Sequence, residues 1–199
     1  MSTLTATGAL PKARPDAPDA VARRRRRATV ARKLLSAAPE AAAGLEWDAL
    51  DTAPAWLALP DTELMVLARQ VGAVVCASNM RLWIDGARLA AARAALGAPF
   101  MQALLALPEA ELLPRNVAPC PMIDGAEQVA AQLRSTGLAV LLASLASGSL
   151  RRAAGAALGT QASSMAQVLA HSLVARAQKL GAPRAPRASA AKSPAGVNA

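Results

Sequence analysis

Few residues in this 199-residue chain could carry out acid–base, nucleophilic or metal chemistry. The single histidine, His171, has no cysteine, aspartate or glutamate at metal-ligand spacing, and we interpret it as a surface or half-buried helix residue. Cys76 stands in the apolar run VGAVVCAS and is expected to be a small core residue, whereas Cys120 is expected in a loop. Glu109 and Glu111 are typical of the solvated start of a helical turn.

The sequence therefore predicts no catalytic, cofactor-binding or metal-binding site. Two cysteines and one histidine are too few for a structural zinc site or a disulfide framework, and a phosphate-binding GxxxxGK[ST] loop and a GxGxxG fingerprint are both absent. We expect a protein that is not an enzyme and has no cofactor, no metal and no small-molecule substrate. Two unpaired cysteines suit a reducing cytoplasm.

The composition predicts an all-α fold. Alanine accounts for 53 residues, hydrophobic residues make up 54% of the chain, and aromatic residues only 2%. Alanine has the lowest cost in a helix, and the aromatic residues that favour strands are scarce. We expect a single compact multi-helix domain over residues 40–181, with a disordered arm over 1–39 and a disordered tail over 182–199.

Periodicity and capping residues place the helices of this domain. Asp61 or Thr62 begins a helix whose apolar stripe recurs at helical spacing, and Asp85 is a good cap for the next helix, which Gly97 ends. A third helix runs from Pro99 to Leu107, followed by a loop over 108–123. We expect Asp124 to cap the longest helix, and two further helices over 150–158 and 162–180. Among the buried residues we expect Trp47, Leu50, Trp56, Met165 and Val168.

The five adjacent arginines form the most conspicuous charged motif. Residues 1–35 have a net charge of +7 and residues 181–199 of +3, whereas residues 36–180 have −1. We therefore expect a frayed helix or a solvated arm that binds an acidic protein or lipid surface more readily than nucleic acid, because no aromatic residues stand between these arginines to stack on bases. Deleting residues 1–35 should then leave the core folded. The motif comprises Arg23, Arg24, Arg25, Arg26 and Arg27.

A secretory signal and a membrane span are not expected. The amino terminus lacks a basic segment followed by an apolar run. The longest uncharged stretch, Ser135–Leu150, is shorter than the roughly 20 residues that cross a bilayer, and we interpret it as a buried helix.

The connection RLWIDG between the first two strong helices is the most distinctive segment. Arg81, Asp85 and Arg88 stand four and three residues apart and could form salt bridges in a helix. Trp83 lies between them and is either a core residue between the two helices or an interface anchor. We take these four residues as a candidate partner interface.

This region resembles the SctK (YscK-type) family, the cytosolic sorting-platform adaptors of bacterial type III secretion systems. The resemblance continues more weakly after Phe100 and into the helix over 125–146. It rests on Leu67-Ala68-Arg69, Gly72, Arg81, Ile84-Asp85-Gly86, Leu89 and Leu96-Gly97.

The resemblance implies a non-enzymatic adaptor that binds two proteins. These are the cytoplasmic domain of the inner-membrane ring protein and the pod protein of the sorting platform. It also implies a cytoplasmic location at the inner face of the inner membrane, with only peripheral membrane contact. The arginine run is outside this pattern, so a nucleic-acid-binding regulator that acts through the run is the alternative function.

Overall fold

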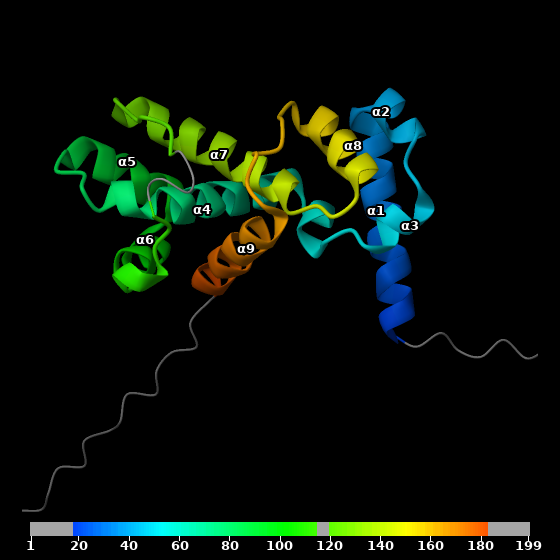
Figure 1. Cartoon of the computed structure of the whole chain (residues 1–199), viewed down its shortest axis with the longest axis horizontal. Helices are drawn as coiled ribbons and strands as arrows, with labels where there is room; N and C mark the ends of the chain where they lie inside the picture. Colours follow the sequence, from blue (N-terminus) through cyan, green and yellow to red (C-terminus); the bar gives the residue numbers. More distant parts are fainter. Residues whose placement is uncertain (1–17, 115–119, 183–199) are drawn as a thin grey trace, which may run out of the picture. The chain divides into compact units, whose positions relative to one another are not determined.

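The regular elements of this protein are helices throughout the ranges that the structure describes. A computed structural model describes residues 18–114 and 120–182 (Figure 1). Contacts group the helices into two units. Unit 1 combines the residues up to Pro60 with Leu145–Gly159, and unit 2 combines Asp61–Ser144 with the residues from Thr160 onward. The all-α expectation is confirmed for these ranges.

Unit 1 is built around its first helix, α1 (Pro18–Ala37), which contacts every other element of the unit. Val30 and Leu34 are fully buried one helical turn apart, so α1 presents an apolar face to these neighbours. The other elements are α2 (Pro39–Ala43), α3 (Trp47–Asp51), the 3₁₀ turn η1 (Ala55–Ala58) and α8 (Gly148–Leu158).

The structure corrects the disordered arm expected over residues 1–39. Residues 18–37 are helical, and Arg27 in this helix pairs with Asp51 of α3 at 2.9 Å. Charge repulsion along the arginine run is offset by this ion pair and by the burial of Val30 and Leu34 on the same helix. Deleting residues 1–35 would therefore remove part of a core. Residues 1–17 and 183–199 lie outside the described residues.

Unit 2 is organised by two long helices that pack along each other, α4 (Asp61–Met80) and α7 (Val129–Ala143). A third helix, α9 (Gln167–Gly181), contacts both of them (Figure 1). The start of α4 at Asp61 is as predicted. The remaining elements are α5 (Gly86–Leu96), α6 (Ala98–Leu105) and the 3₁₀ turns η2 (Glu109–Glu111) and η3 (Ala126–Gln128).

Two glycines allow α4 and α7 to approach each other closely. A Cβ atom on Gly72 of α4 would overlap the backbone carbonyl of Leu133 in α7. A Cβ atom on Gly137 of α7 would overlap the backbone carbonyl of Ala68 in α4. The obstacle on each side is backbone, which cannot rotate away as a side chain can. The two helices therefore depend on glycine at both positions.

Capping residues in the sequence predict some helix ends correctly and others incorrectly. The Asp85 side chain accepts a hydrogen bond from the backbone N–H of Ala87 at the start of α5, and Gly97 ends that helix with φ +82°, as predicted. Asp124 does not cap α7, which begins at Val129 after the turn η3. The chain is still extended at Gly125, with φ −128° and ψ 153°, so it cannot enter a helix directly after Asp124.

Some large apolar residues lie on the surface instead of in the core. Trp47 is 69% exposed and Val168 is 83% exposed, so both expectations of burial are wrong. Val168 is in the first turn of α9, which begins at Gln167 instead of near 162. Leu50 and Trp56 are buried as expected.

Replacing Leu34 with alanine should destabilise unit 1 far more than the same change at the next residue. Leu34 is 1% exposed and Leu35 is 53% exposed. We expect Leu34→Ala to lower the free energy of unfolding by about 2–5 kcal/mol and Leu35→Ala to lower it by less than about 0.5 kcal/mol. Urea denaturation followed by circular dichroism measures both values. Equal effects would show that α1 is not part of the core.

Alanine at Gly72 or Gly137 should destabilise unit 2, because each new methyl group would push a backbone carbonyl away. We expect a loss of at least about 2 kcal/mol for each variant in thermal or urea unfolding. Gly86→Ala is the matched control, since nothing lies within 4 Å of a Cβ atom there. Its expected effect is neutral or slightly stabilising. A wild-type unfolding midpoint for Gly72→Ala would contradict the close crossing.

Candidate partner-binding site

The four residues predicted as an interface lie at the corner between α4 and α5. Met80 ends α4 and Gly86 begins α5, so residues 81–85 form the corner itself. The Asp85 carboxylate both caps α5 and pairs with Arg88 Nε at 3.1 Å. This ion pair agrees with the predicted spacing of three residues.

Arg88 connects three parts of the site. Besides its ion pair with Asp85, it donates from Nη1 to the backbone carbonyl of Ile123 at 3.0 Å. Its guanidinium also lies over the ring of Trp83, 5.7 Å from the ring centroid, within the range of a cation–π contact. Arg88 therefore fixes the indole of Trp83 and the segment around Ile123 at the same time. Trp83 itself is half-buried, so it is not a fully enclosed core residue.

Arg81 has a different role from the one predicted. It does not pair with Asp85, because residues 81–85 are a turn and an extended segment and do not continue the helix. Its guanidinium instead donates to the carbonyls of Leu105, at 2.9 Å, and Leu107. These carbonyls lie at and just after the end of α6, where helical partners run out. Arg81 thus joins the corner to the end of α6.

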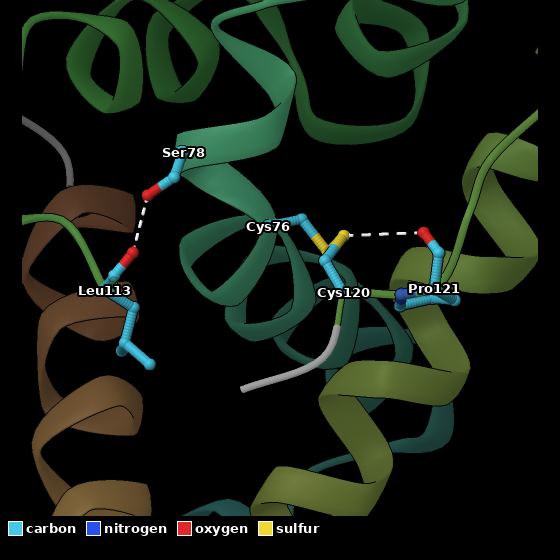
Figure 2. The surroundings of a disulfide bond; sticks show 5 residues. All are labelled: Cys76, Ser78, Leu113, Cys120 and Pro121. Atoms are coloured by element: carbon cyan, nitrogen blue, oxygen red, sulfur yellow. Dashed lines mark hydrogen bonds between the residues drawn. A yellow bond between two sulfur atoms is a disulfide. The ribbon is translucent and has the colours of Figure 1, made fainter. Parts of the chain in front are cut away.

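A disulfide bond holds a second segment against the corner. Cys76 of α4 is bonded to Cys120, with the two Cα atoms 5.2 Å apart (Figure 2). The expectation of two unpaired cysteines is therefore wrong. The two cysteines are 44 positions apart in the chain, and the sequence gave no sign that the segment from Cys120 lies against α4 in the folded protein. Near the same bond, Ser78 Oγ donates to the carbonyl of Leu113 at 2.6 Å (Figure 2).

Three large apolar side chains are exposed on this framework, and we call them the apolar patch: Leu82, Ile84 and Met122. Ile84 is 96% exposed, Met122 84% and Leu82 57%. Leu82 and Met122 line a hollow of about 280 Å³ together with Trp83, Arg88 and Cys120. Leu82 also lines a second hollow of about 530 Å³, whose lining includes Arg81 and Glu109.

Three of the four residues that the sequence predicted as an interface thus stabilise the corner from within. Arg81, Asp85 and Arg88 make the hydrogen bonds that hold the corner in place, whereas the exposed apolar side chains belong to residues that sequence reasoning did not select. A signal for two of them was present. Leu82 and Ile84 are apolar residues just after the end of a helix, where neither continues an apolar stripe.

The arginine run lies on α1 in unit 1. Arg27 is half-buried, pairs with Asp51, and lies 5.8 Å from the ring centroid of Trp47. Arg23, Arg24, Arg25 and Arg26 are exposed. The run therefore consists of one half-buried arginine, Arg27, and four exposed ones.

Comparisons with known proteins identify no relative. Neither protein-family models nor curated proteins nor solved structures include a match to this chain. Across residues 18–114 and 120–182, three or more histidine, cysteine or acidic side chains never gather at distances suited to a metal ion. In the same ranges, none of the helices has the length and apolarity needed to cross a lipid bilayer.

The Cys76–Cys120 bond should contribute to stability by shortening the unfolded chain. For two cysteines separated by 44 residues, chain entropy gives about 4 kcal/mol. We expect Cys120→Ser to lower the urea midpoint to that of the reduced wild type. Alkylation of the denatured wild type followed by mass spectrometry should modify both thiols only after a reductant is added. Two free thiols in air-oxidised protein would contradict the bond.

Proposed function

We propose that this chain is a non-enzymatic adaptor that binds other proteins through the apolar patch at the α4–α5 corner. The observation that carries the proposal is that Leu82 and Met122, 57% and 84% exposed, line one hollow, while Ile84, two residues after Leu82 in the same corner, is 96% exposed. An isolated exposed apolar residue is ordinary, but large apolar side chains gathered around a hollow are typical of protein-binding surfaces.

The support beneath the patch favours binding without much rearrangement. Arg88 binds the segment that bears Met122 through the carbonyl of Ile123, and Arg81 attaches the corner that bears Leu82 and Ile84 to α6. Neither contact needs the disulfide. A surface held in this way loses little conformational entropy when a partner binds. Trp83 and Arg88 at its edge are also residue types enriched at protein interfaces.

We further propose that the partners belong to a type III secretion sorting platform. The support is the sequence resemblance to SctK-type adaptors, together with the structural roles of the residues that carry it. Gly72 lies at the crossing of α4 and α7, Arg81 binds the end of α6, Asp85 caps α5, and Gly97 has a positive φ. These residues maintain the fold of unit 2, so a related protein that keeps them would keep this fold. The proposed partners are the inner-membrane ring protein's cytoplasmic domain and the pod protein.

The proposed location is the cytoplasmic face of the inner membrane, and the disulfide provides a test of it. Cytoplasmic thiol systems keep most cysteines reduced, so Cys76 and Cys120 should be thiols there. Cells quenched in acid and alkylated at once should yield protein with both cysteines modified. Protein that is fully oxidised in such cells would contradict a cytoplasmic location.

Binding to the two proposed partners should depend on the apolar patch. We expect the wild-type chain to co-elute with the ring protein's cytoplasmic domain and with the pod protein of the same bacterium in size-exclusion chromatography. The double variant Ile84→Asp with Met122→Asp should weaken at least one of these complexes by about tenfold or more, because it places charges where apolar contact is needed.

The control is Val168→Asp, which introduces a charge at an 83% exposed residue of α9 in the same unit and should leave binding unchanged. Absence of both complexes with folded wild-type protein would refute the type III secretion proposal. Complexes that form equally well with the double variant would refute the assignment of the patch.

A further inference from the structure

The outward face of α1 carries a regular apolar stripe. Val21, Ala28 and Leu35 occur at intervals of seven residues, which places them within about 40° of one another around the helix. All three are exposed, Val21 to 37% and Leu35 to 53%. Arg25 and Arg32 are also exposed, and their own interval of seven residues places them along one side of the stripe.

The opposite face of the same helix is fixed within unit 1. Val30 and Leu34 are fully buried, and they lie about 160° and about 120° around the helix from Ala28 at the middle of the stripe, where α1 contacts the other elements of its unit. Arg27 adds an ion pair with Asp51. The stripe is thus held at a defined orientation on a helix that is already formed.

We propose that this outward face of α1, which we call the Arg25–Arg32 face, binds an acidic amphipathic helix of a partner protein. Apolar residues at intervals of seven supply one of the two apolar positions per heptad with which one helix packs along another, and charged residues beside such a stripe select the charge of the partner. A partner helix with leucine facing Val21 and Leu35 and with glutamate facing Arg25 and Arg32 would complement both features.

The chain itself shows how an arginine of this run meets an acidic helix. Arg27 pairs with Asp51 of α3 at 2.9 Å and lies over Trp47 of the same short helix. One α1 arginine thus contacts a carboxylate and an apolar ring on one neighbouring helix. The proposed partner would contact the Arg25–Arg32 face in the same two ways, through carboxylates that pair with the arginines and through apolar side chains.

The apolar stripe also decides between a protein and the other anionic partners. Phosphates of duplex DNA would engage the arginines and leave Val21 and Leu35 without an apolar counterpart. A membrane surface-binding helix needs a broad face of large apolar residues, whereas the middle of this stripe is Ala28. An acidic amphipathic helix satisfies both the charged and the apolar residues.

The test uses the full chain and a synthetic three-heptad helical peptide with leucine along one face and flanking glutamates. Fluorescence anisotropy at moderate salt measures its affinity. We expect micromolar binding that falls about tenfold or more for Arg25→Glu with Arg32→Glu, because like charges would then meet across the interface. Leu35→Asp should give a loss of similar size. A scrambled peptide of the same composition should bind at least about tenfold more weakly.

The matched control is Arg23→Glu with Arg26→Glu, which changes the net charge by the same amount on the same helix but away from the stripe. We expect this variant to lose no more than about threefold in affinity. Equal losses for the two charge-reversed pairs, equal binding of the scrambled peptide, or no binding of the helical peptide would each overturn the proposal.

Two further probes separate the other partner classes. A short duplex DNA and vesicles of phosphatidylcholine with phosphatidylserine should each bind more weakly than the helical peptide. Tighter binding of either would overturn the proposal in favour of phosphate recognition. This test does not depend on the proposed secretion partners, because the peptide binds α1 and not the apolar patch. The Ile84→Asp, Met122→Asp variant should therefore bind the peptide with wild-type affinity.

Discussion

The contact of α4 with α7 through Gly72 and Gly137 is the constraint on which unit 2 depends. Each glycine faces a backbone carbonyl of the other helix, so the distance between the two helices is set by main-chain atoms. The corner that bears Trp83 directly follows the end of α4, so the position of α4 determines where this corner lies. Cys76 also lies on α4, so the segment joined to it by the disulfide is placed by the same crossing. A change at either glycine would therefore displace the candidate site without touching any of its residues.

In both units, some charged residues make contacts that hold the structure together, while residues next to them in the chain are exposed and available to a partner. At the α4–α5 corner, Arg81 donates to backbone carbonyls at the end of α6, Asp85 caps the N-terminus of α5, and Arg88 pairs with Asp85. On α1, Arg27 uses its charge on Asp51. The neighbouring residues, among them Ile84 and Arg25, are left exposed by these interactions. Charged residues of distinctive spacing are thus partly structural in both units.

The sequence predicted what depends on local chemistry. Asp85 and Gly97 determine the two ends of α5 through interactions within a few residues, and these ends are correct, as is the start of α4 at Asp61. Apart from the misplaced starts of α7 and α9, the errors concern contacts between distant segments. The Cys76–Cys120 bond and the burial of Val30 both depend on parts of the chain that approach only in the folded protein. The exposure of Met122 was equally hidden, because it depends on where the segment after Cys120 lies in the folded protein.

Unit 1 consists of two stretches of the chain that the ribosome synthesises at different times. Helix α8 contacts α1, α2 and α3, yet residues 61–144 are translated between them. The amino-terminal helices therefore emerge from the ribosome well before their last partner exists. During that interval the apolar side chains of Val30 and Leu34 lack part of their final cover. A nascent chain of this kind is a natural client for a chaperone that shields exposed apolar surface until translation has passed residue 159.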